Sequence, residues 1–121
     1  MNLARGKTVM TTEQQRKILE AAAKVCGVYL LWHERWGCFY DYNKRHESKD
    51  FQEWNPLDNP ADCAEMCAKL EISHAWRYCQ VRATNRIVLH DEPHDGTPEG
   101  RLKAWMYAAT MVAAKIGGFT E

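Results

Sequence analysis

Three features common in other protein classes are missing from this chain of 121 residues: an excess of one charge, a long apolar run and a glycine-rich phosphate motif. Its 16 Lys and Arg residues balance its 16 Asp and Glu residues. Domains that track a phosphate backbone usually carry a basic excess, so the balance argues against that class but allows a local basic patch. No apolar run approaches the ~20 residues of a membrane span, and no signal-peptide pattern opens the chain. We therefore expect a cytoplasmic protein without membrane contact.

Catalytic motifs are also missing from the sequence. It contains no nucleotide-binding glycine fingerprint and no Gly-x-Ser-x-Gly nucleophile elbow. We therefore expect no enzymatic activity and no cofactor.

The cysteines are odd in number, which predicts reduced thiols rather than a disulfide framework. All of them fall within apolar-patterned segments, where a free cysteine behaves as a small hydrophobic residue. We expect buried thiols at Cys26, Cys38, Cys63, Cys67 and Cys79.

The length suits one domain, which we place at residues 11–121 behind a flexible N-terminal arm at 1–10. Three helices are predicted from their apolar spacing and their caps. The first spans residues 13–26 and ends at Gly27. The second spans 60–70, with Asn59 as its cap and Pro60 in the first turn. The third begins with Thr97 and Pro98 and ends at Gly117.

Aromatic and β-branched residues predict two pairs of strands, at 28–32 with 36–42 and at 73–83 with 86–90. A tight turn at Thr84 and Asn85 would join the second pair, and a loop would follow at 91–96. The predicted order is α-β-β-α-β-β-α. This is an α+β fold, an α/β/α-type sandwich with one mainly antiparallel sheet of about four strands and three helices.

One face of the strand at 73–83 carries the best candidates for binding. Alternation places Trp76, Tyr78 and Arg82 together, near Arg86. If helices cover both faces of the sheet, Trp76 and Tyr78 belong to the core. If the face is exposed, it could stack a base and contact phosphate, or anchor a protein interface, where Trp, Tyr and Arg are enriched.

Two further aromatic residues, Trp32 and Trp36, lie on the first predicted hairpin. With Tyr40 they could form a patch for a partner or for a second copy of the chain, so both a monomer and a homodimer stay open.

Metal binding has weak support. His90 and His94 flank carboxylates on a predicted loop and could hold a divalent ion, although a hydrophilic connector is the simpler interpretation. Cys63 and Cys67 lie one helical turn apart, but Met66 on the same stripe favours the core. We expect no metal site.

A family resemblance adds to this interpretation. The block Trp54-Asn55-Pro56-Leu57, followed by a helix with Asp62, Ala64 and Lys69-Leu70, resembles the signature of the phage ABA sandwich family. Residues 21–25 and 108–117 are similar to that family's first and last helices. The resemblance implies a phage or prophage origin and an α/β/α sandwich. The family has no established activity, so no catalytic residue is carried over.

Together these observations predict a phage-encoded, non-enzymatic accessory protein that binds and modulates a host protein or complex. The most specific form of this prediction is counter-defence, in which the protein inhibits a host defence system as anti-CRISPR proteins do. The alternative is a nucleic-acid or nucleotide binding module that uses Trp76, Tyr78, Arg82 and Arg86. A metal enzyme centred on His90 and His94 is a third class.

Overall fold

The computed structural model describes residues 10–33, 35, 37–41 and 53–120. Most of the expected N-terminal arm lies outside these residues, and so does Trp36. The described helices are α2 (Thr12–Cys26), α3 (Pro60–Leu70) and α4 (Pro98–Ile116). The described strands are β1 (Leu30–His33), β2 (Cys38–Asp41), β3 (Ser73–Trp76), β4 (Gln80–Thr84) and β5 (Leu89–Pro93). The predicted α+β class is confirmed for this part of the chain.

The helix ends agree with the sequence prediction because local side chains fix them. Thr11 caps α2: its hydroxyl accepts from the Gln14 backbone N–H at 3.1 Å, and the Gln14 side chain accepts from the Thr11 N–H at 3.0 Å. The Asn59 side chain caps α3, and the Thr97 hydroxyl caps α4. Each cap satisfies backbone donors that the first turn leaves unpaired.

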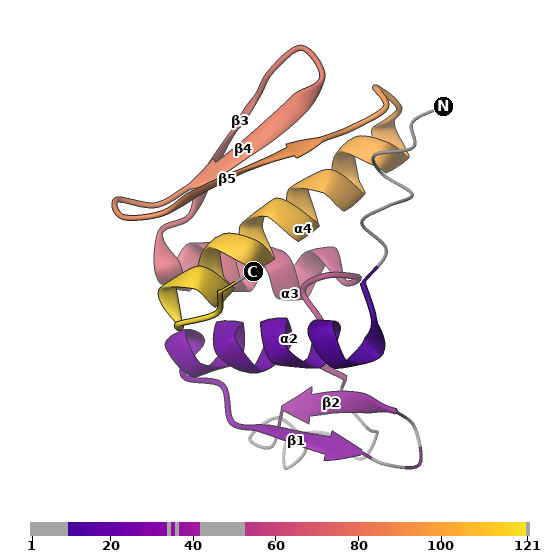
Figure 1. Ribbon diagram of the computed structural model, residues 1–121, viewed down its shortest axis with the longest axis vertical. Helices are drawn as coiled ribbons and strands as arrows, with labels where there is room; N and C mark the ends of the chain where they lie inside the picture. Colours follow the sequence, from indigo (N-terminus) through magenta and orange to yellow (C-terminus); the bar gives the residue numbers. More distant parts are fainter. Residues whose placement is uncertain (1–9, 34, 36, 42–52, 121) are drawn as a thin grey trace.

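The order of the layers differs from the predicted sandwich. Figure 1 shows helices in the middle, with β3–β4–β5 beyond α4 and the β1–β2 hairpin beyond α2. The prediction of one four-stranded sheet between helices is wrong, because the described strands form two separate antiparallel sheets of two and three strands. Apolar periodicity shows which face of an element is buried, but it does not show which element covers it.

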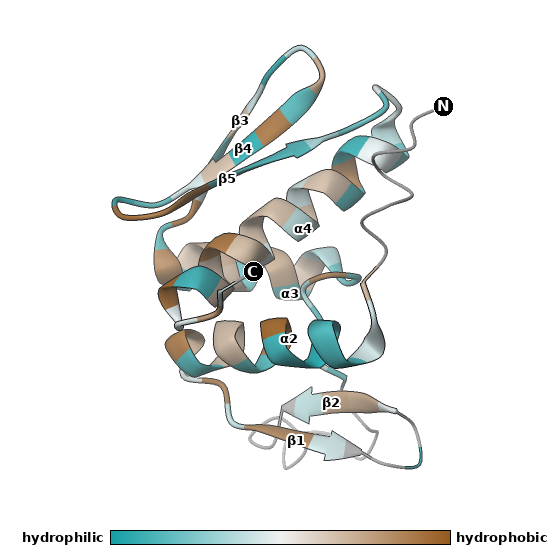
Figure 2. Ribbon diagram, in the orientation of Figure 1, coloured by the Kyte–Doolittle hydropathy of each residue, from teal (hydrophilic) through white to brown (hydrophobic). Residues whose placement is uncertain are grey.

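Helix α4 supplies much of the core because other elements pack on several of its sides. It contacts α2 and α3, and also β4 and β5. Figure 2 shows its middle as mainly apolar, whereas β5 is mainly hydrophilic. Small side chains let the neighbouring backbones approach closely. Its buried residues are Ala104, Met106, Ala108, Ala109, Thr110, Met111, Val112, Ala113 and Ala114.

The predicted strand at 73–83 is in fact a hairpin. The Arg77 N–H donates to the Gln80 carbonyl at 2.8 Å, and this bond closes a turn over Tyr78 and Cys79. Neither residue is among those that usually mark a tight hairpin turn, so no local signal predicts the reversal. The polypeptide therefore forms two strands, β3 and β4, where one was expected.

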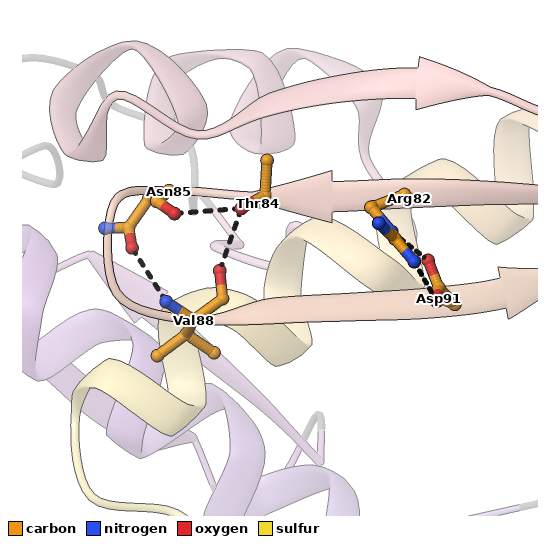
Figure 3. A network of polar contacts seen from close by, with 5 residues as sticks. All are labelled: Arg82, Thr84, Asn85, Val88 and Asp91. Carbon is orange, nitrogen blue, oxygen red and sulfur yellow. Dashed lines mark hydrogen bonds and ion pairs between the residues drawn. The ribbon is translucent and has the colours of Figure 1, made fainter.

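The next turn lies two residues later than predicted. The Asn85 N–H donates to the Val88 carbonyl at 3.0 Å, and the Asn85 side-chain oxygen accepts from the Ile87 and Val88 N–H groups. Figure 3 shows this turn. Asn85 therefore starts the turn, and Arg86 and Ile87 form its loop. The last strand consequently spans Leu89–Pro93, which includes part of the predicted 91–96 loop.

The thiols are all free, but they are not all buried. Cys63 is fully buried, and Cys26, Cys38 and Cys67 are half-buried. Burial raises the pKa of Cys26 to about 11. Cys79 is exposed, so the prediction of burial is wrong there, because the residue lies in the β3–β4 turn. No helix among the described residues is long and apolar enough to cross a bilayer.

Candidate functional site

The strand register separates residues that the sequence placed on one face. Trp76 pairs with Val81, and Arg82 pairs with Ala75. Paired residues share a face, and successive residues alternate between faces. Trp76 therefore lies on the face that carries buried Val81, whereas Arg82 lies on the opposite face. The prediction of a shared face is wrong because it assumed that the chain does not reverse at Tyr78.

Both predicted arginines are paired with carboxylates. The Arg82 guanidinium donates to the two Asp91 oxygens at 2.7 and 3.0 Å, as Figure 3 shows. This pairing lowers the pKa of Asp91. Arg86 lies in the β4–β5 turn and binds Glu71 at 2.9 Å. Neither guanidinium adjoins Trp76 in the arrangement that nucleotide binding would need.

Trp76 and Tyr78 do not belong to the core. Trp76 is 48% exposed and Tyr78 is 98% exposed. The interpretation in which a helix covers both residues is wrong, because Trp76 ends β3 and Tyr78 lies in the β3–β4 turn, at one end of the sheet (Figure 1). Helix α4 covers the middle of the sheet, where Val81 and Ala83 are fully buried. Two large aromatic side chains are thus presented at the end of a hairpin.

A shallow groove lies where this hairpin meets the first turns of α4. Trp76 and Arg77 line it from the hairpin, and Pro98, Arg101 and Leu102 line it from the helix. We call these five residues the Trp76 groove. Leu102 is 41% exposed although its side chain is apolar. Among the described residues, no carboxylate lines the groove.

An aromatic cluster lies beside the groove. The Trp76 ring is 5.5 Å from His74 and 5.9 Å from His94, and the His74 ring is 5.8 Å from Trp105, between ring centroids. The His94 Nε2 and the Trp105 Nε1 are buried without a hydrogen-bond partner in the described part of the chain. Such unsatisfied nitrogens are uncommon in folded proteins, and both fall in this one cluster.

The predicted histidine pair is divided between two environments. His94 contacts Trp76, whereas His90 lies between the sheet and α4. The Lys115 ammonium donates to His90 Nδ1 at 3.2 Å, so His90 Nε2 donates to Glu92 at 3.1 Å. Within the described ranges, no group of three or more His, Cys, Asp or Glu side chains could hold a metal ion.

The other predicted patch lies at the far end of the molecule. Trp32 belongs to β1, and Figure 1 shows the β1–β2 hairpin and the β3–β5 sheet on opposite sides of the helices. Trp32 is partly buried: it packs edge-on against Phe39 at 4.9 Å, and the Arg16 guanidinium lies 4.0 Å from its ring centroid. Trp32 and Trp76 therefore cannot form one surface.

Comparison with known proteins adds no assignment. No protein-family model, curated protein or solved structure matches the chain. The likeness to the phage ABA sandwich family therefore rests on the residues quoted above.

Sequence reasoning missed Arg77, Arg101 and the groove that they share. In the single strand expected at 73–83, alternation puts Arg77 on the face opposite to Trp76 and Tyr78, and Arg101 is not among the candidate residues. Their proximity depends on the hairpin and on the path of β5 into α4. No local sequence signal carries that information.

Proposed function

We propose that this chain is a phage-encoded, non-enzymatic accessory protein that binds a host protein or complex through the Trp76 groove and Tyr78. The observation that carries the proposal is the exposure of Trp76 and Tyr78 beside two arginines. Trp, Tyr and Arg are enriched among the hot spots of protein interfaces, because each combines a large contact area with a polar group.

A protein partner suits the charges better than nucleic acid does. The chain has no net charge, and Arg82 and Arg86 are engaged with carboxylates. A phosphate backbone is bound by several free cations, and its binding weakens steeply with salt. The nucleic-acid alternative would have to rely on Arg77 and Arg101 alone among the arginines around this hairpin.

The phage part of the proposal is supported by the resemblance of the Trp54-Asn55-Pro56-Leu57 block. In the most specific form of the proposal, the bound host complex is a defence system, and binding blocks the activity of that system. Expression of the protein in a host that carries the defence system should then restore phage plaques, and the groove variants described next should not.

We expect loss of the partner when the exposed aromatic residues are removed. A tagged Trp76→Ser/Tyr78→Ser protein should capture at least about tenfold less of the host partner than the unaltered protein, because interface hot spots each contribute ~2 kcal/mol or more. Quantitative mass spectrometry of pull-downs from infected host lysate measures this ratio.

The matched control is Tyr29→Ser, which removes another exposed tyrosine, 59% exposed, in the segment between α2 and β1. This variant should capture the partner as well as the unaltered protein does. Equal capture by the Trp76/Tyr78 variant would contradict the proposal, and so would equal losses in both variants.

A further inference from the structure

The Trp76 groove is locally basic in a neutral protein. Arg77 and Arg101 line it, and no carboxylate does so among the described residues. The other arginines near this sheet differ, because Arg82 binds Asp91 and Arg86 binds Glu71. Arg77 and Arg101 make no ion pair within the described part of the chain. Both guanidinium groups therefore keep hydrogen-bond donors for an external anion, although the charge of Arg77 contributes, after the Arg82 hydrogen bond, to the lowered pKa of Asp91.

The rest of the lining is apolar. Trp76, Pro98 and Leu102 contribute a ring face or edge, a pyrrolidine and a branched aliphatic chain. Trp76 and Leu102 are each almost half exposed, so covering them would remove apolar area from water. An occupant that matches both halves of the lining must carry negative charge and apolar side chains close together.

We infer that the groove binds an acidic, partly apolar peptide segment of the partner protein. This inference rests on the proposed function and adds the chemistry of the partner. Aspartate or glutamate side chains would accept hydrogen bonds from Arg77 and Arg101, since guanidinium and carboxylate groups match in planar, two-pronged geometry. A neighbouring apolar side chain would lie against Trp76 and Leu102.

The observations favour a peptide over an oligonucleotide. Proteins that bind single-stranded nucleic acid combine aromatic side chains, on which the bases stack, with a basic groove that follows the phosphate backbone. Here two arginines sit beside three apolar residues, and the total charge of the chain is zero. An alternation of charge and apolar contact over a short span is a property of a peptide.

The test is selection of a random displayed peptide library on the intact protein. Peptides enriched on the unaltered protein should contain an excess of Asp and Glu next to aromatic or aliphatic residues. Arg77→Glu and Arg101→Glu should each weaken a selected, fluorescein-labelled peptide by about tenfold or more, because each loses a charge-assisted hydrogen bond and gains repulsion. Raised salt should weaken the same peptide.

Lys103→Glu is the matched control. It makes the same charge reversal at an exposed position on α4, the helix that carries Arg101, but Lys103 does not line the groove. This variant should bind the selected peptide within about twofold of the unaltered protein. Circular dichroism should show all three variants folded, because these side chains are exposed and the arginines lack ion pairs within the described residues.

Four results would overturn the inference: no enriched peptide, enrichment without an acidic excess, acidic peptides that still bind the arginine variants, or tighter binding of a labelled oligonucleotide that depends on Arg77 and Arg101. Failure here is separable from failure of the proposed function. If Trp76→Ser/Tyr78→Ser loses the host partner while Arg77→Glu and Arg101→Glu keep it, the interface stands and its acidic chemistry does not.

Discussion

Replacement of Trp54 by alanine is expected to destabilise the protein by about 3–5 kcal/mol, the range measured for large aromatic deletions in cores. Trp54 is 2% exposed, and its backbone N–H donates to the Phe39 carbonyl at 3.1 Å. Its side chain belongs to the main core cluster, together with Phe39, Leu19 and Met66. Because a domain is stable by only ~5–15 kcal/mol in total, this loss is a large fraction. Urea unfolding measures it.

The control is the same substitution at an exposed tryptophan. Trp76→Ala should cost about 1 kcal/mol or less, because half of that side chain is already in water. Equal losses at the two positions would contradict the burial on which both the core and the groove are based.

Gly117→Ala is expected to destabilise the protein by about 1–3 kcal/mol, near the upper end of that range. Gly117 ends α4 with a φ of −78°, so alanine fits its backbone conformation. The added Cβ would instead meet the Ala21 carbonyl oxygen and lie 2.9 Å from the Ala21 carbonyl carbon. A backbone cannot rotate away as a side chain can, so α2 and α4 must move apart. Urea unfolding of the variant measures the cost.

Gly100→Ala is the matched change at the other end of α4. Its added Cβ would meet the Asp95 side chain, which can rotate if it gives up the two hydrogen bonds that it accepts from Thr97. Alanine also favours a helix over glycine by about 1 kcal/mol, which offsets part of the cost. We expect a clearly smaller loss than at Gly117. A Gly117→Ala protein as stable as the unaltered one would show that the two helices do not approach as closely as described.

The helices were predictable because their limits are set by neighbours in sequence. Thr11 with Gln14, Asn59 with Pro60 and Thr97 are signals of one turn or less. The strand at 73–83 was not predictable in the same way. Its pattern continues through Tyr78 and Cys79, and the reversal there depends on pairing with residues on either side rather than on a turn-forming residue.

The order of the layers could not be predicted from local sequence patterns for a related reason. Val81 and Ala83 indicate that one face of β4 is buried, but not that α4 covers it. The same limit applies to the candidate site. Trp76 and Tyr78 were identified by residue type, whereas the roles of Arg82 and Arg77 depended on the face that each occupies. The sequence pattern placed Arg82 beside Trp76. Because the chain reverses at Tyr78 and Cys79, Arg82 lies on the opposite face, and Arg77 lines the groove with Trp76 instead.

In the proposed function, a partner binds at the Trp76 groove and not at the β1–β2 end. Nuclear magnetic resonance of the tryptophan indole N–H groups tests it directly, during titration with the purified partner from the pull-down. The signal of Trp76 should shift or broaden, and that of Trp105, whose ring contacts His74 next to Trp76, should follow, while those of Trp32 and Trp54 stay unchanged. A shift of Trp32 with an unchanged Trp76 signal would contradict the claim.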